Sequence, residues 1–112
     1  MDALSFYKCL ADATRLRLLL LLTRESELCV CELTESLGDS QPKISRHLAQ
    51  LRACKLIQDR RQGQWVFYRL DDKLPRWCRE VLEQTLRAEQ DLITQACLDL
   101  DNMSRRALRC AP

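Results

Sequence analysis

The sequence predicts a mainly α-helical domain that carries one small β-hairpin. Most of the chain repeats apolar residues at helical spacing, and 2 Gly with 5 % aromatic residues suit a helical protein. Two β-prone runs, 56–61 and 64–70, flank Gly63, which can supply the positive φ of a hairpin turn. The 112 residues suffice for one domain with a modest core, expected over residues 1–106, followed by a flexible tail at 107–112.

The expected helices have apolar faces and recognisable end signals. They cover residues 3–11, 13–23, 29–37, a segment between Ser40 and Lys55, and about 75–106. Asp12 and Ser40 are good N-caps, and Gly38 suits the position just after a helix. The last helix would be about thirty residues long, and its apolar stripe is longer than a domain of this size can cover. We therefore expect a partner subunit to cover this stripe.

Charge is unevenly distributed along the chain. The net charge is +2, but seven basic residues and one acid lie between Ser40 and Leu70, a local charge of +6. A basic central third with acidic flanks predicts an anionic partner at one face.

The central third has the order of a winged helix-turn-helix. A short helix, a turn at Gly38, a second helix with a narrow apolar stripe and a basic hairpin follow one another. Double-stranded DNA is the expected partner, because Gln, Lys, Ser and Arg side chains suit base edges and phosphates. The predicted DNA-binding residues are Gln41, Lys43, Ser45 and Arg46 on the second helix, and Arg60, Arg61, Gln62 and Gln64 on the hairpin. The single histidine, His47, lies beside the apolar stripe, which favours a partly buried structural role.

A pair of thiols, Cys29 and Cys31, precedes this DNA-reading segment. Thiols at a helix N-terminus are readily deprotonated, and thiolates bind soft ions such as As(III), Sb(III), Cd(II) or Pb(II). If both residues lay in a regular helix, their side chains would point about 200° apart. One ion could then be held only by distorting the first turn, so metal binding and DNA binding would oppose each other.

Several classes are disfavoured by composition. No apolar run approaches the about 18 residues of a membrane span, and the N-terminus lacks a secretory pattern, so we expect a cytoplasmic protein. Seven cysteines, an odd number, argue against a disulfide scaffold. A thiol enzyme such as an arsenate reductase would need an oxyanion cradle, which 2 Gly do not support, so no enzymatic activity is expected.

The chain resembles the ArsR/SmtB family of winged-helix repressors, and most of all its arsenic-responsive branch. The resemblance rests on four segments: Leu10–Arg17, Glu27–Leu33, Ser40–Leu48 and Arg61–Leu70. It implies a repressor that forms a homodimer through the first and last helices and sits on an operator before arsenic-resistance genes. The repressor would be released when As(III) or Sb(III) binds Cys29 and Cys31, with no organic cofactor. A cadmium- or lead-responsive or thiol-redox-responsive repressor of the same fold is the alternative.

Two departures from the family pattern bear on the site. Some relatives carry a third cysteine where this chain has Thr34, so a third ligand must come from elsewhere or be a solvent molecule or exogenous thiol. The candidates in the chain are Cys9, Cys54, Cys78, Cys97 and Cys110. Lys55 stands where relatives often have Gly, and a positive φ there would cost about 1 kcal/mol, so a different helix end is conceivable.

Overall fold

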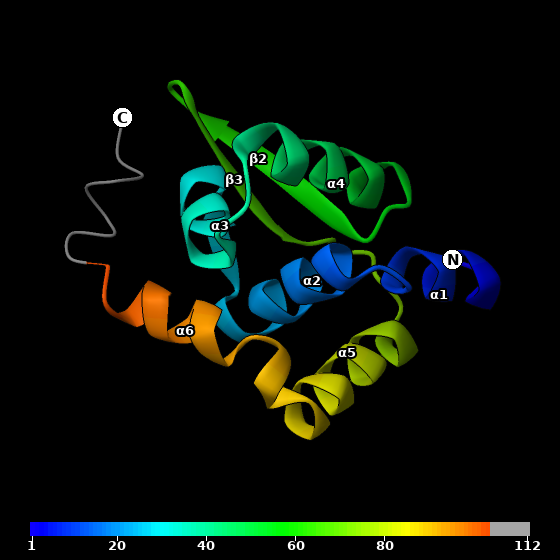
Figure 1. Cartoon of the computed structure of the whole chain (residues 1–112). Coiled ribbons are helices and arrows are strands. Elements are labelled where there is room, and N and C mark those ends of the chain that lie inside the picture. The colour runs from blue at the N-terminus through cyan, green and yellow to red at the C-terminus, as the bar shows by residue number, and fades with distance from the viewer. Residues whose placement is uncertain (104–112) are drawn as a thin grey trace.

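The computed structural model describes residues 1–103, which form six α-helices, one short 3-10 helix and a three-stranded sheet (Figure 1). The helices are α1 (Ala3–Leu10), α2 (Ala13–Glu25), α3 (Val30–Leu37), α4 (Gln41–Ala53), α5 (Arg76–Ala88), η1 (Gln90–Leu92) and α6 (Thr94–Asp101). The strands are β1 (Glu27–Cys29), β2 (Ile57–Gln62) and β3 (Trp65–Leu70). The expected tail at 107–112 and Cys110 lie outside the described residues. None of the helices in the described range is long and apolar enough to cross a membrane.

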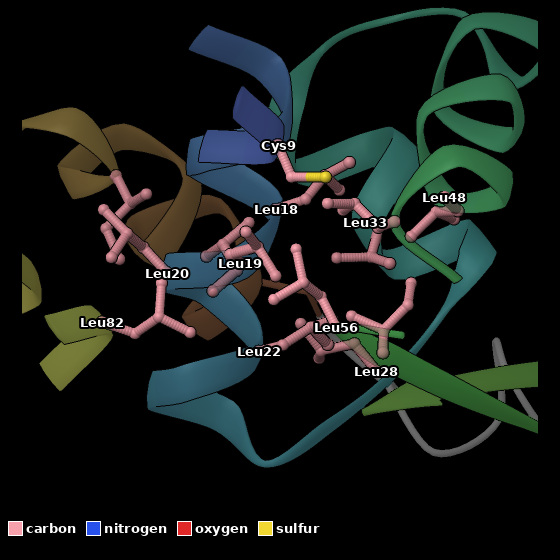
Figure 2. Packing of buried hydrophobic residues seen from close by; sticks show 14 of the residues in the cluster. Cys9, Leu18, Leu19, Leu20, Leu22, Leu28, Leu33, Leu48, Leu56 and Leu82 are labelled. Atoms are coloured by element: carbon pink, nitrogen blue, oxygen red, sulfur yellow. The ribbon is translucent and has the colours of Figure 1, made fainter. Parts of the chain in front are cut away.

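The core is organised around α2. Five consecutive leucines, Leu18–Leu22, are at most 1 % exposed, because α2 is surrounded by α1, α4, α5 and the sheet. Figure 2 shows Leu18 on the side of Leu33 in α3 and Leu20 on the side of Leu82 in α5. Each fully buried leucine contributes about 1.5–3 kcal/mol relative to an exposed one, so this helix anchors α1, α4, α5 and the sheet.

The hairpin of β2 and β3 turns at Gly63 and Gln64, and Gly63 has the expected positive φ of 62°. One strand was not predicted: β1 pairs with β3 in antiparallel register, Leu28 opposite Tyr68, which gives the sheet order β1-β3-β2. A strand of three residues carries too little alternation to be recognised in the sequence. Through this pairing, the chain just before α3 is hydrogen-bonded to the hairpin.

The prediction of one long C-terminal helix is wrong. The helix ends at Ala88, Glu89 adopts φ −124° and ψ 45°, and the chain resumes as α6 only at Thr94. The break lets α5 pack on α2 while α6 turns to pack on α3 (Figure 1). The apolar stripe is therefore continuous in sequence but buried against two different helices, and it no longer demands a partner subunit by its length alone.

The end of α4 keeps the backbone conformation that glycine would favour, although the residue is Lys55. Lys55 has φ 64°, and its N–H donates to the Arg52 carbonyl at 3.0 Å. The Leu56 N–H donates to the Leu51 carbonyl at 3.0 Å, and both leucines are buried. These bonds form a Schellman motif with its apolar contact, which holds Lys55 in the left-handed region. The possibility of a different helix end is thus not realised.

Candidate thiol site and nucleic-acid interface

The thiol pair sits where β1 passes into α3. Cys29 is the last residue of β1 and the N-cap of α3, with extended backbone at φ −85° and ψ 163°, while Cys31 lies in the first helical turn. The two sulfur atoms lie 2.6 Å apart. The expectation that both cysteines lie in the helix and face away from each other is wrong, because Cys29 is not helical. The extended backbone of Cys29 therefore brings the two sulfurs together at the start of α3 while the helix stays intact.

Glu32 holds this conformation in place. The Cys29 N–H donates to a Glu32 carboxylate oxygen at 3.1 Å, and the Cys29 side chain faces the backbone N–H of Glu32, which completes a capping box. Cys29 is fully buried and Glu32 is 6 % exposed, so water cannot replace these contacts.

Cys31 opens onto a groove of about 670 Å³ between α3 and the hairpin. The groove also touches Thr34, Gln41 at the start of α4, and Gln64 and Trp65 at the hairpin. The half-buried Cys31 thus gives the site access to solvent, while Cys29 lies behind it in the core.

The other described cysteines lie in different parts of the fold. Cys9 in α1 is hydrogen-bonded to the thiol of Cys54 at the end of α4, and burial, followed by this contact, raises the pKa of Cys9 to about 11. Cys78 in α5 is buried and Cys97 in α6 is half-buried, and burial raises the pKa of each. Within residues 1–103, no cluster of three His, Cys, Asp or Glu side chains has the arrangement of a metal site. The hydroxyl of Thr34 donates to the Val30 carbonyl at 2.8 Å.

The predicted DNA-binding residues of α4 lie at its exposed N-terminal part. Gln41, Ser45 and Arg46 are exposed, while the Lys43 ammonium pairs with Asp39 at 3.2 Å and keeps 41 % of its side chain exposed. The opposite face of α4 packs on α3, because Ile44 and Leu48 join the same buried cluster as Leu33. The packing of α3 therefore sets the position of these polar side chains.

The hairpin residues divide into two groups. Arg61, Gln62 and Gln64 are exposed at or beside the turn. Arg60 is engaged within the protein: its guanidinium donates to the Glu27 carboxylate at 2.8 Å and lies 4.4 Å from the centre of the Phe67 ring. The hydrogen bond from Arg60 lowers the pKa of Glu27. Arg60 thus ties β2 to β1, a role that sequence reasoning missed because β1 was not recognised.

His47 is 9 % exposed, in agreement with the partly buried position expected for it. Its Nδ1 lies 3.9 Å from the carboxylate of Asp12, the N-cap of α2. The backbone N–H of Arg15, followed by the charge of His47, lowers the pKa of Asp12. The histidine thus faces α2 rather than the exposed surface of α4.

Comparison with known proteins gives a consistent result. A family model described as "Bacterial regulatory protein, arsR family" matches residues 12–59. The arsenic resistance transcriptional regulator ArsR2 of Pseudomonas putida is 53 % identical over 103 residues, which cover 92 % of this chain and 90 % of the relative. The arsenical resistance operon repressor of Escherichia coli is 49 % identical over 90 residues, covering 80 % and 77 %.

Solved structures agree on the fold. HlyU from Vibrio cholerae matches with a TM-score of 0.70 at 35 % identity, covering 77 % of this chain and 89 % of HlyU. The AntR antimony-specific transcriptional repressor matches with a TM-score of 0.67 at 30 % identity, covering 79 % and 77 %. The expected winged helix-turn-helix is confirmed. This chain belongs to the ArsR family of bacterial transcriptional regulators and is not an enzyme.

Proposed function

We propose that the protein represses an arsenic-resistance operon and leaves its operator when As(III) or Sb(III) binds Cys29 and Cys31. The observation that carries this proposal is the pair of facing sulfurs, 2.6 Å apart at the N-cap of α3. Thiolates prefer soft ions, which suits trivalent arsenic and antimony. The printed names of the relatives, two of them arsenic resistance regulators and one an antimony-specific repressor, support the same ligands.

DNA recognition is assigned to α4 and the hairpin. Gln41, Ser45 and Arg46 would enter the major groove, and Arg61 and Gln64 would reach the neighbouring backbone or minor groove. Lys43, Arg60 and Gln62 remain in the proposed set, although Lys43 and Arg60 must leave Asp39 and Glu27 to contact DNA fully.

We assign the dimer interface to α1 and α5. Leu4, Tyr7 and Trp77 are exposed by 73 %, 51 % and 38 %, and the ring centres of Tyr7 and Trp77 lie 5.2 Å and 5.0 Å from that of Phe6. An exposed aromatic and aliphatic cluster of this kind suits burial against a second copy. A dimer would place two recognition helices about 34 Å apart, one turn of DNA, on an inverted repeat. In this proposal residues 1–106 act as one domain, and the protein works in the cytoplasm, where its thiols stay reduced.

In this proposal, metalloid binding and DNA binding are coupled through the packing of α3. Binding at Cys29 and Cys31 changes the contacts at the start of α3, and α3 supports α4. If the metalloid-bound form disfavours the DNA-bound position of α4, DNA must weaken metalloid binding by the same factor. The unwinding of α3 expected from the sequence is not required.

The experiment is a mobility shift on upstream DNA, with and without micromolar arsenite. We expect arsenite to release the wild type but not Cys29→Ser/Cys31→Ser, while Cys97→Ser, which removes a half-buried thiol in α6, should behave as wild type. Survival of the wild-type complex in arsenite, or equal release of the double variant, contradicts the proposal. Facing thiols also suit a redox sensor, and release by peroxide but not by arsenite would favour that alternative. Stronger binding of Cd(II) than of As(III) would favour a cadmium sensor.

A second experiment tests the DNA interface. Arg46→Ala should weaken operator binding about tenfold or more, since a good side-chain contact to a base contributes about 1–3 kcal/mol. Lys73→Ala is the matched control, because it also removes one exposed positive charge, and Lys73 lies in the segment between β3 and α5, outside α4, the hairpin and the helices assigned to the dimer interface. Equal affinities of the two variants would contradict the assignment of α4.

A further inference from the structure

The first turn of α2 contacts both α1 and α4. Asp12, the N-cap of α2, has a carboxylate oxygen 3.9 Å from Nδ1 of His47 in α4. Arg15, in the same turn, reaches both neighbouring helices with its guanidinium. Since α1 carries part of the patch assigned to the dimer interface and α4 carries residues assigned to DNA, this turn connects the two proposed interfaces.

Arg15 binds the C-terminal end of α1. Its Nε donates to the Cys9 carbonyl at 2.8 Å, and its Nη2 donates to the Lys8 carbonyl at 3.2 Å. The last carbonyls of a helix have no partner four residues further along, and the helix carries a partial negative charge there. A guanidinium suits this end, because it is always charged and presents its N–H donors in a fixed plane. Arg15 therefore fixes the end of α1 to the start of α2.

The remaining terminal nitrogen of Arg15 reaches α4. Its Nη1 donates to the side-chain oxygen of Gln50 at 3.3 Å. Gln50 lies four residues after Arg46 and so on the same face of α4. Arg46 is one of the residues proposed to enter the major groove, so Arg15 holds the recognition helix α4 one turn away from a reading position.

We propose that Arg15 is a positioning residue for operator binding: it holds α4 to α1, so that the dimer interface sets the separation of the two recognition helices. The inference rests on the proposed function, which assigns α1 and α5 to the dimer and α4 to DNA. A dimer gains from binding two half-sites at once only when its geometry allows both to be engaged together. In this role Arg15 contacts no base and acts through α4.

A second contact between α1 and α4 is formed by the thiols of Cys9 and Cys54. Cys54 follows the last residue of α4, two turns beyond Arg46. A thiol is a weak donor and a weak acceptor, whereas the hydrogen bonds of Arg15 come from a charged group. The thiol contact should therefore restrain α4 less firmly than Arg15 does.

The test compares two DNA duplexes: the inverted repeat located by footprinting the wild-type protein on upstream DNA, and the same duplex with one half-site scrambled. Arg15→Gln should lower the affinity for the full repeat by about three- to tenfold, the effect of about one net hydrogen bond. It should leave the affinity for the single half-site unchanged, and it should tolerate an extra base pair between the half-sites better than the wild type. A loss of stability alone would lower both affinities by the same factor, so the ratio of the two affinities identifies a positioning role.

Arg24→Gln is the matched control, because it makes the same substitution near the other end of α2, where Arg24 lies 3.6 Å from Asp101 of α6. It should keep the wild-type ratio. Arg15→Lys should be intermediate, since lysine keeps the charge but not the fixed directions of the three donors. Gln50→Ala should lower the same ratio, and adding it to Arg15→Gln should cause little further loss, because both remove one interaction.

An unchanged ratio in Arg15→Gln overturns the inference. Equal losses on both duplexes refute it as well, as does dissociation of the variant dimer in sedimentation, which would make the loss one of assembly. Additive losses of Arg15→Gln and Gln50→Ala, with weaker half-site binding by Gln50→Ala, would mean that Gln50 contacts DNA by itself, again against the inference. These results leave the proposed function intact, whereas a wild type that binds upstream DNA as a monomer, or not at all, contradicts the proposed function and the inference with it.

Discussion

Replacing Glu32 by alanine should destabilise the protein by about 2 kcal/mol. The carboxylate accepts a hydrogen bond from the Cys29 N–H at 3.1 Å, and both residues are buried. A hydrogen bond to a charged group contributes about 1.5–3 kcal/mol, and alanine recovers only a few tenths through its higher helix propensity. Glu32→Gln keeps an oxygen acceptor but loses the charge at the helix N-terminus, so about 1 kcal/mol should be lost.

Urea unfolding followed by circular dichroism measures this difference. With a slope of about 2 kcal/mol per molar urea, the midpoint should fall by about 1 M for Glu32→Ala and about 0.5 M for Glu32→Gln. Glu83→Ala, at an exposed position on α5, should change stability by less than about 0.5 kcal/mol. If the midpoint of Glu32→Ala falls no further than that of Glu83→Ala, the capping box does not hold Cys29 in place. Arsenite affinity should decrease together with stability, because the cap positions one of the two thiols.

Three further predictions concern the backbone, acid stability and thiol reactivity. Lys55→Gly should raise stability by about 0.5 kcal/mol, since relief of the left-handed conformation exceeds the added entropy of the unfolded chain; Lys55→Ala, which keeps the strain, should give no gain in the same urea assay. The pKa of Glu27 is lowered from 4.5 by Arg60, so its contribution to stability is present above pH 4.5 and is lost as the pH falls below it. Glu27→Gln should therefore flatten the loss of thermal stability measured between about pH 5 and 3, and an unchanged profile would exclude this pair as a cause. At pH 8, iodoacetamide should modify Cys54 faster than Cys9, whose thiol is buried and has a pKa of about 11; peptide mass spectrometry giving the reverse order would contradict this.

The sequence was sufficient for the elements that are defined by local signals. Asp12 and Ser40 cap the N-termini of α2 and α4, and Gly38 ends α3, as expected from their residue types. The hairpin turns at Gly63, also as expected. The DNA-reading order of helix, turn, helix and hairpin was recognisable for the same reason: each part carries its own cap, turn residue or periodicity.

What the sequence could not reveal depends on contacts between distant segments. Cys29 was assigned to a helix because its extended conformation comes from pairing with Phe67, far along the chain. The break at Glu89 follows no glycine or proline, and is set by the different partners of α5 and α6. Both errors affected function, since the first placed the sulfurs apart and the second made a dimer seem necessary for burial.

The pairing of β1 with β3 also determines when β1 can form during synthesis of the chain. Leu28 and Tyr68 are partners in the sheet, so about forty residues must follow β1 before it can become a strand, and a loop of that length must close. Until then the cysteines belong to a flexible chain whose sulfurs have no fixed separation. The mature arrangement of the thiols is a late product of folding, and it appears only when the hairpin has been made.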